Sequence, residues 1–293
     1  MITVLINPKG GTAKGANAVE NLQQLLAARL PQARVEVVPR GDQLIDRARA
    51  ACADGAEIVA AAGGDGTLSA VSQALIGSDV RLGVLPFGTR NHFALDVGVP
   101  LDLEQAVDLL AAGTARRIDV GAVNDAYFIN NASIGLYPQL VYLRDQGTWP
   151  PSKMLRTYTT VFKLALVAKP IPLQLQAAHL NMKEMVWMIF VGNNSYNMGI
   201  YDTGRRAALD TGQVEIVAVP ARSRWTLVRL IMNAVQGHTR PRYVQRIATE
   251  RADVLLPVEI NNCDVALDGE IRRMDGPLVI RSVPQSLWVV ASQ

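Results

Sequence analysis

The sequence predicts an α/β N-terminal domain, with a parallel sheet and flanking helices, followed by an antiparallel, β-rich, sandwich-like C-terminal domain. Over the first ~120 residues, short apolar runs alternate with amphipathic segments of helical period, which is typical of a parallel α/β sheet. From about Val123 onward, short strand-like runs are separated by Gly, Asn and Pro. This second pattern is typical of an antiparallel sheet or sandwich.

The N-terminal domain is expected to alternate four strands with four helices. The strands are predicted at Ile2–Asn7, Arg34–Val38, Glu57–Ala62 and Leu82–Leu85. The helices are predicted at Ala18–Leu30, Asp42–Ala53, Thr67–Ile76 and Leu103–Ala112. The third strand is apolar almost throughout, as a strand buried on both faces requires.

The C-terminal domain is expected to consist mainly of short strands. They are predicted at Tyr127–Asn130, Leu173–Leu180, Val186–Val191, Val214–Val219, Val254–Ile260 and Val265–Asp268. Two helices are predicted at Ser152–Val167 and Ser223–Gln236. The resulting domains are residues 1–122 and 123–285. A final strand is predicted at Ser286–Val290, and residues 286–293 could return to the first domain.

The composition is that of a globular protein: 293 residues, 49% hydrophobic and 19% charged, with a formal net charge of +3. A mild positive charge suits acidic partners such as nucleotides or anionic lipids, but it is too weak to indicate a nucleic-acid-binding protein. Cys52 and Cys263 lie far apart without metal-ligand spacing, which favours a reducing, cytoplasmic location. No apolar run reaches the ~20 residues of a membrane span.

The sharpest local feature is the loop GGDGT, Gly63–Thr67, between an apolar strand and a helix. Glycines in such a loop let the backbone approach a phosphate without a Cβ in the way. The N–H groups of the first helical turn supply an anion site, which the helix dipole reinforces. Since a carboxylate repels a bare phosphate, Asp65 favours binding through Mg²⁺ or its water ligands. The alternative is a plain strand-to-helix turn with Asp65 as a helix cap.

Two further loops follow strands of the same sheet, Asn7–Gly15 after the first strand and Leu85–Ala94 after the fourth. In a parallel sheet all three loops lie at the carboxyl edge, where open α/β sheets bind ligands. None of them matches the P-loop pattern or the dinucleotide-binding pattern. Lys9 and Lys14 could neutralise phosphate charge, or could equally be solvated surface residues.

Together these loops resemble the catalytic domain of the diacylglycerol kinase family, which includes bacterial diacylglycerol kinases, YegS-like lipid kinases and sphingosine kinases. Asn7-Pro8, GGDGT and the segment Pro86–Ala94 occur in the order of that family. The fourth element, LDGE at Leu267–Glu270, occurs where the family has its catalytic acid pair. GGDGT alone is shared with NAD kinases, whereas the four elements together are specific and cover essentially the whole chain.

The resemblance implies a kinase that uses ATP and Mg²⁺ to phosphorylate a hydroxyl of a membrane lipid such as diacylglycerol. It assigns ATP binding to Asn7, Gly63, Gly64, Asp65, Gly66, Thr67, Thr89 and Asn91. Asp65 is also expected at the metal. Catalysis is assigned to Asp268 and Glu270, because a carboxylate can accept the proton that the attacking hydroxyl loses. Without the resemblance, an ordinary hairpin turn would be the preferred interpretation of this Asp-Gly pair.

Three positions depart from the usual pattern of the family. Where the family commonly reads GGDGTxNE, Ala70 replaces the acid, and where it reads GTxNDFA, His92 replaces the Asp. In the second domain, the Asp of an accessory metal site is replaced by Thr211. Asp96 lies four residues after His92 on the same helical face, so it could replace the missing carboxylate or merely pair with His92.

Two C-terminal segments combine basic and aromatic residues, as suits an anionic bilayer surface. One is Ser152–Lys169, and the other runs from Arg222 to Arg251 and includes Trp225 and Tyr243. Amphipathic helices packed on the second sheet would have the same composition. The resemblance to lipid kinases favours the membrane interpretation.

The sequence therefore predicts a cytoplasmic, peripherally membrane-associated lipid kinase in which ATP and lipid meet between two domains. The expected partners are ATP, a membrane lipid and an anionic membrane surface, without nucleic acid, and a homodimer is left open. The alternatives are an NAD kinase-like enzyme and a catalytically silent nucleotide- or lipid-binding protein. The changes at Ala70, His92 and Thr211 keep the silent protein open, whereas Asp268 and Glu270 favour the enzyme.

Overall fold

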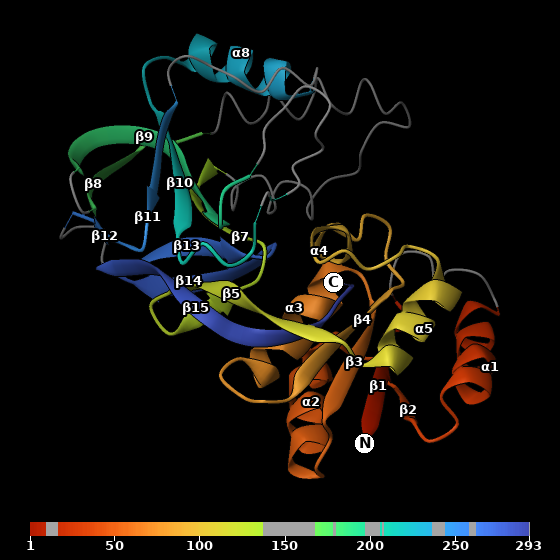
Figure 1. The fold of residues 1–293 in the computed structure, drawn as a ribbon. Helices are drawn as coiled ribbons and strands as arrows, with labels where there is room; N and C mark the ends of the chain where they lie inside the picture. Colours follow the sequence, from red (N-terminus) through yellow and green to blue (C-terminus); the bar gives the residue numbers. More distant parts are fainter. Residues whose placement is uncertain are drawn as a thin grey trace. The chain divides into compact units, whose positions relative to one another are not determined.

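The computed structural model divides into two compact units (Figure 1). It describes residues 1–9, 17–136, 168–177, 180–196, 206, 208–235, 244–257 and 262–292. Unit 1 comprises Met1–Val120, Ala208–Gly212 and Val283–Gln293. Unit 2 comprises Gly121–Ala207 and Gln213–Ser282.

Unit 1 contains a parallel sheet with the strand order β2–β1–β3–β4. Its strands are β1 (Ile2–Ile6), β2 (Arg34–Val37), β3 (Ile58–Gly63) and β4 (Arg81–Pro86). The end of the chain adds a parallel neighbour, because Trp288 and Val289 of β15 (Leu278–Val290) pair with β4. Every residue of β3 is buried, as in a central strand that is covered on both faces.

Helices flank this sheet (Figure 1). They are α1 (Ala18–Arg29), α2 (Leu44–Ala53), α3 (Asp65–Leu75), α4 (His92–Asp96) and α5 (Leu103–Ala112). α2 packs beside α3, and α1 packs beside α5. At α5, Asp102 caps the start by accepting the Gln105 N–H (3.0 Å), and Gly113 ends the helix with φ 67°. The predicted α/β class is confirmed, although α2 begins at Leu44, after a 3₁₀ turn at Gly41–Gln43, and not at Asp42.

Unit 2 is an antiparallel β-structure with one described helix, α8 (Arg224–Val235). Its strands are β6 (Ala126–Phe128), β7 (Asn131–Gly135), β8 (Ile171–Ala177), β9 (Leu180–Asn193), β10 (Val214–Pro220), β11 (Gln245–Thr249), β12 (Arg251–Leu255), β13 (Asn262–Leu267) and β14 (Glu270–Asp275). The main order is β14–β13–β7–β9–β8–β12–β15, and β10 pairs with β9 and β11. The predicted antiparallel, β-rich class is confirmed. β5 (Ala115–Val123) and β15 contribute residues to both units.

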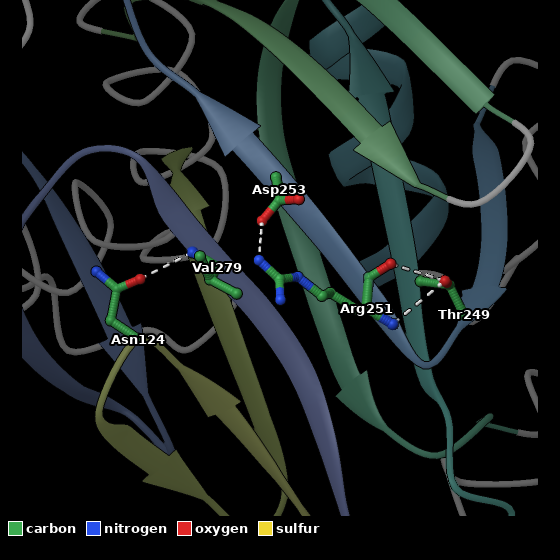
Figure 2. Close-up of polar contacts among 5 residues, drawn as sticks. All are labelled: Asn124, Thr249, Arg251, Asp253 and Val279. Carbon is green, nitrogen blue, oxygen red and sulfur yellow. Dashed lines mark hydrogen bonds and ion pairs between the residues drawn. The ribbon is translucent and has the colours of Figure 1, made fainter.

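The core of unit 2 consists of apolar side chains from its strands. They include Ile134, Leu175, Val191, Ile216 and Val254, all buried. At the turn between β5 and β6, Asn124 adopts a left-handed φ of 52°. Its side-chain oxygen accepts the Val279 N–H (2.8 Å), which ties this turn to β15 (Figure 2).

Several sequence predictions need correction. The strand predicted at Tyr127–Asn130 ends at Phe128, so that residues 129–130 form a short link to β7. The strand predicted at Val186–Val191 is longer and spans Leu180–Asn193. β5, β7, β11 and β14 are not predicted at all. The helix predicted at Ser152–Val167 lies outside the described residues, as do Lys14 and the end of the strand predicted at Val254–Ile260.

Candidate functional site

The described parts of the three predicted phosphate loops lie together at the carboxyl edge of the unit 1 sheet. The side-chain amide of Asn7, after β1, donates to the Thr67 hydroxyl (3.0 Å) at the start of α3. The Phe87 N–H, after β4, donates to the carbonyl of Gly63 (3.0 Å). The predicted convergence of these loops is therefore present in the geometry.

Packing requires glycine at two loop positions. A Cβ on Gly63 would lie 2.3 Å from the Thr67 hydroxyl oxygen, and a Cβ on Gly88 would lie 2.3 Å from Cα of Gly64. Both distances are far below van der Waals contact. These two glycines are therefore explained by the close approach of the loops alone.

Packing does not require glycine at Gly64 or Gly66. A Cβ on Gly64 would make an ordinary contact at 3.4 Å, and a Cβ on Gly66 would meet no atom within 4 Å. Both residues lie at the N-terminal turn of α3, where backbone N–H groups and the helix dipole attract anions. The open space at this turn suits a phosphate that approaches the backbone closely.

Asp65 acts as a cap for a different helix from the one that it begins. Its carboxylate accepts the backbone N–H of His92 (3.3 Å) and of Phe93 (3.0 Å), the first residues of α4. Asn91 precedes α4 with a left-handed φ of 51° and makes no side-chain cap. Since the predicted alternative placed the Asp65 cap on its own helix, this is a correction: Gly64 is the N-cap residue of α3.

The predicted amide residues shape the loops. The side chain of Asn91 donates to the Gly88 carbonyl (2.9 Å) and accepts the Gly88 N–H (3.0 Å), which closes the loop after β4. Asn7 accepts the Lys9 N–H (3.0 Å) in the same way. Thr89, in contrast, is exposed beside the buried Asn91. Asn7 and Asn91 therefore hold the loops, and Thr89 presents its side chain to solvent.

The residues present fit a metal that arrives with a nucleotide. Among the residues that the structure describes, no three His, Cys, Asp or Glu side chains come together as a metal cage. Mg²⁺ usually takes one or two carboxylates, with the other ligands coming from substrate phosphates and water. Asp65 can supply a single carboxylate of this kind.

In unit 2, Asp268 and Gly269 form the two-residue turn between β13 and β14. Both have positive φ, 48° and 92°, and Leu267 pairs with Glu270 across the turn. This is the hairpin turn that the Asp-Gly pair predicts. The Asp268 carboxylate also accepts three backbone N–H bonds from the link between β6 and β7, at 2.8–3.0 Å.

The two predicted catalytic acids have different environments. Asp268 is half-buried, and its donors are the N–H groups of Ile129, Asn130 and Asn131. The side chain of Glu270 is 67% exposed and lies 4.0 Å from the Arg272 guanidinium. Asp268 is therefore fixed by the backbone, whereas Glu270 faces solvent.

A polar cluster on the other side of the 129–131 link escapes the sequence analysis. Arg206, only 6% exposed, donates to the carbonyl of Ile129 and to the side chain of Asn130 (3.3 Å). The Tyr196 hydroxyl donates to the Asn130 carbonyl (3.0 Å), and the Asn193 side chain to that of Ile129 (3.1 Å). Because Asp268 holds the N–H groups, the link is fixed from both sides. The sequence around Arg206 does not indicate this role, because an arginine is normally expected at the surface.

Asp119, in β5 of unit 1, is a second residue that the sequence analysis misses. It is fully buried and accepts the backbone N–H of Gly212 (2.6 Å) and of Gln285 (2.9 Å). It thereby holds the segment that contains Thr211, one of the three departures noted in the sequence. An acid between the apolar residues Ile118 and Val120 was the available signal.

A hollow of about 990 Å³ in unit 2 contains none of the predicted site residues. It lies at the ends of β8, β9, β11 and β12 and is lined in part by Thr249, Arg251 and Asp253 (Figure 2). Arg251 pairs with Asp253 (3.1 Å), and the Thr249 hydroxyl donates to the Arg251 carbonyl (2.8 Å). The side chains of Thr249, Arg251 and Asp253 thus already have partners within the sheet.

Comparisons with known proteins agree with these features. Residues 1–123 match the family described as Diacylglycerol kinase catalytic domain. A diacylglycerol kinase of Mycobacterium tuberculosis strain H37Rv is 28% identical over 302 aligned residues, which cover 99% of this chain and 94% of that protein. A diacylglycerol kinase of Bacillus subtilis strain 168 is 46% identical over 89 residues, or 29% of each chain.

The fold is also similar to that of solved structures. A crystal structure of a diacylglycerol kinase from Bacillus anthracis strain Sterne superposes with a TM-score of 0.70 at 17% identity, covering 99% of this chain and 96% of that one. A second crystal structure from the same organism gives a TM-score of 0.75. At this level of identity the likeness concerns the fold alone.

Proposed function

Because residues 1–123 belong to the diacylglycerol kinase catalytic domain family, as the sequence predicts, we propose that this protein is a lipid kinase. It transfers the γ-phosphate of ATP to a hydroxyl of a membrane lipid such as diacylglycerol. The observation that carries this proposal is the open space over Gly66 in the first turn of α3, beside Gly64, where packing does not require glycine either. Relatives along nearly the whole chain are diacylglycerol kinases, which supports this class of acceptor.

Unit 1 binds ATP through the backbone of its loops. The N–H groups of the first turn of α3 face the phosphates, while the side chains of Asn7, Thr67 and Asn91 hold the loops in place. Thr89 is exposed on the neighbouring loop and contacts the nucleotide. Mg²⁺, when bound, neutralises phosphate charge, and Asp65 is the residue that would hold it.

The turn at Asp268 orients the acceptor hydroxyl. Three backbone N–H groups fix the carboxylate, so its oxygens have one orientation before the lipid arrives. A carboxylate at hydrogen-bond distance accepts the proton that the hydroxyl loses as it attacks phosphorus. Glu270, which is exposed, shares this task.

A catalytically silent nucleotide- or lipid-binding protein is the second candidate. Ala70, His92 and Thr211 stand where the family usually has an acid. In addition, the carboxylates of Asp65 and Asp268 have structural roles that a silent protein would also need. A protein without catalytic activity could therefore retain both Asp65 and Asp268 for these structural roles.

A single assay separates these alternatives. The purified protein is incubated with labelled ATP and, in turn, with diacylglycerol, phosphatidylglycerol, a sphingoid base in mixed micelles, and NAD in solution. We expect a labelled lipid, and the lipid that is labelled identifies the acceptor. Labelling of NAD alone would establish an NAD kinase instead. ATP binding by calorimetry without any labelled product would establish the silent protein.

A further inference from the structure

The first turn of α8 holds a tryptophan in the solvent. Ser223 caps this helix, because its hydroxyl oxygen accepts the Thr226 N–H (3.1 Å) and its carbonyl accepts the Leu227 N–H (3.2 Å). Trp225 lies within the capped turn, and its side chain is 83% exposed. The cap fixes the backbone under this indole, so the exposure belongs to an ordered helical turn.

One face of α8 packs against unit 2, and the opposite face is exposed to solvent. Leu227 is fully buried and packs in an apolar cluster with Trp187 and Val219. At about 100° per residue, Trp225 and Arg229 each lie about 160° from Leu227 around the helix, on opposite sides, and only about 40° from each other. Trp225 and Arg229 therefore share the face that points away from the cluster, and both are exposed.

The charged residues in the segment that contains α8 are all positive. Residues 221–235 contain Arg222, Arg224 and Arg229 and no Asp or Glu. All three arginines are exposed. An indole among arginine side chains is the combination that binds the interface of an anionic bilayer, where the ring sits at headgroup depth and the guanidinium groups meet phosphates.

Other arginines of this basic segment are used within unit 2. Arg246 pairs with Glu215 (3.2 Å) on the neighbouring strand β10, and Arg251 pairs with Asp253 (Figure 2). Arg240 and Arg242 lie outside the described residues. The exposed arginines that share the start of α8 with Trp225 are Arg222, Arg224 and Arg229.

We propose that Trp225, with Arg222, Arg224 and Arg229, is a docking surface for an anionic lipid bilayer. The proposal rests on the proposed function in one respect, namely that a lipid kinase must reach a hydroxyl in a bilayer. Docking itself requires no turnover. No helix among the described residues is long and apolar enough to cross a membrane, and a surface of this kind needs none.

Vesicle sedimentation tests the surface without ATP. With vesicles of phosphatidylcholine and about 30 mol% phosphatidylglycerol, each arginine near the surface contributes about fivefold to binding. Replacing all three arginines by glutamine should therefore weaken binding on the order of 100-fold. Arg251→Gln is the matched control and should bind as wild type, because Arg251 pairs with Asp253. Equal binding by the triple variant and wild type would overturn the proposal.

The indole is tested separately. Transfer of roughly 60 Å² of the Trp225 ring out of water corresponds to about tenfold in binding, which Trp225→Ser should lose. Leu101→Ser, at a 50% exposed position in unit 1, is the control and should lose nothing. The chain has four tryptophans, and bromine-labelled acyl chains should quench wild-type fluorescence more than that of Trp225→Ser. Identical quenching in both would show that Trp225 does not enter the interface.

Turnover on a water-soluble, short-chain diacylglycerol distinguishes this proposal from the proposed function. Trp225→Ser should phosphorylate the soluble lipid as wild type does and act poorly on vesicles. If the wild type phosphorylates no lipid but binds anionic vesicles through Trp225, the docking surface stands and the kinase proposal fails. If it phosphorylates the soluble lipid but does not bind vesicles, the docking surface is wrong.

Discussion

Asp268→Asn is the substitution for which the structure changes the expectation most. Asparagine has the same shape as aspartate. From the sequence alone, the substitution is therefore expected to keep the hydrogen bonds of the side chain and to remove only the proton acceptor. The structure shows otherwise, because the two carboxylate oxygens accept N–H bonds from three residues of the 129–131 link. An asparagine side chain has one accepting oxygen and a donating nitrogen.

The magnitude follows from these contacts. If the Asn oxygen keeps the N–H groups of Asn130 and Asn131, its nitrogen faces the Ile129 N–H, which lies 2.9 Å from the corresponding Asp268 oxygen. A hydrogen bond to a charged group contributes about 1.5–3 kcal/mol, and all three lose the charge. We expect the free energy of local opening to fall by about 2–3 kcal/mol, which makes amide exchange roughly 30- to 150-fold faster.

Hydrogen exchange of the amides in the 129–131 link, followed by mass spectrometry, measures this directly. Asp275→Asn is the control, because Asp275 is an exposed acid on the same hairpin. Its exchange at the link should equal that of wild type. Lipid phosphorylation by Asp268→Asn should fall by about 10²–10⁴, with ATP affinity unchanged. Exchange at wild-type rates in Asp268→Asn would refute the role of the carboxylate as the holder of this link.

Four further predictions follow from the described geometry. Gly66→Val should abolish ATP binding in calorimetry with the fold intact, whereas Gly41→Val, whose Cβ also meets open space, should bind normally; normal binding by Gly66→Val would remove the loop from the nucleotide site. Asp65→Ala should speed amide exchange at the start of α4, because each lost N–H bond contributes about 1.5–3 kcal/mol; unchanged exchange would contradict the cap. Burial raises the pKa of Cys263 to about 11, so near pH 8 its thiolate fraction is roughly 200-fold below that of an ordinary thiol. Iodoacetamide should alkylate Cys263 more slowly than an ordinary exposed thiol by about that factor, and the rate should increase as the pH rises. Alkylation at the rate of an ordinary thiol would contradict the raised pKa. Glu270→Gln should lower lipid turnover without changing exchange in the 129–131 link, and full turnover would exclude Glu270 from catalysis.

Local signals made much of unit 1 predictable from the sequence. Three of its strands are apolar runs that end at a loop, and α5 has both a capping Asp and a terminating Gly. β5 escapes prediction because Arg116 and Arg117 interrupt its apolar pattern; both are exposed, whereas the strand is buried from Ile118 onward. A strand that is exposed at one end and buried at the other has no single period.

Unit 2 was less predictable because its strands owe their places to partners far away in sequence. β14, with the sequence EIRRMD, has no buried face, and it is held as the second arm of the hairpin that turns at Asp268. β7, with the sequence NASIG, is almost wholly buried although four of its five residues are small or polar. In both strands, pairing overrides the composition.

The candidate site residues likewise fall into a part that the sequence predicts and a part that it does not. Glycine patterns and strand ends locate the loops, since both are local. The partners of the acids are not local: Asp119 lies 93 residues from Gly212 and 166 residues from Gln285. Asp65 lies 28 residues before Phe93. No periodic pattern in the sequence indicates such distant pairs. The sequence therefore identifies the acids as candidate site residues but does not show which backbone N–H groups their carboxylates bind.

These long-range partners change what the retained acids mean. Asp65 holds the start of α4, and Asp268 holds the link between β6 and β7, so substitution of either one disturbs a loop whatever the chemistry. Loss of activity in those variants would therefore agree with a catalytic role and with a structural role alike. Glu270 differs, because its exposed side chain accepts no backbone N–H bond among the described contacts and pairs at 4.0 Å with Arg272. A fall in turnover at Glu270, with the fold and the 129–131 link unchanged, is thus the result that a silent binding protein could not produce.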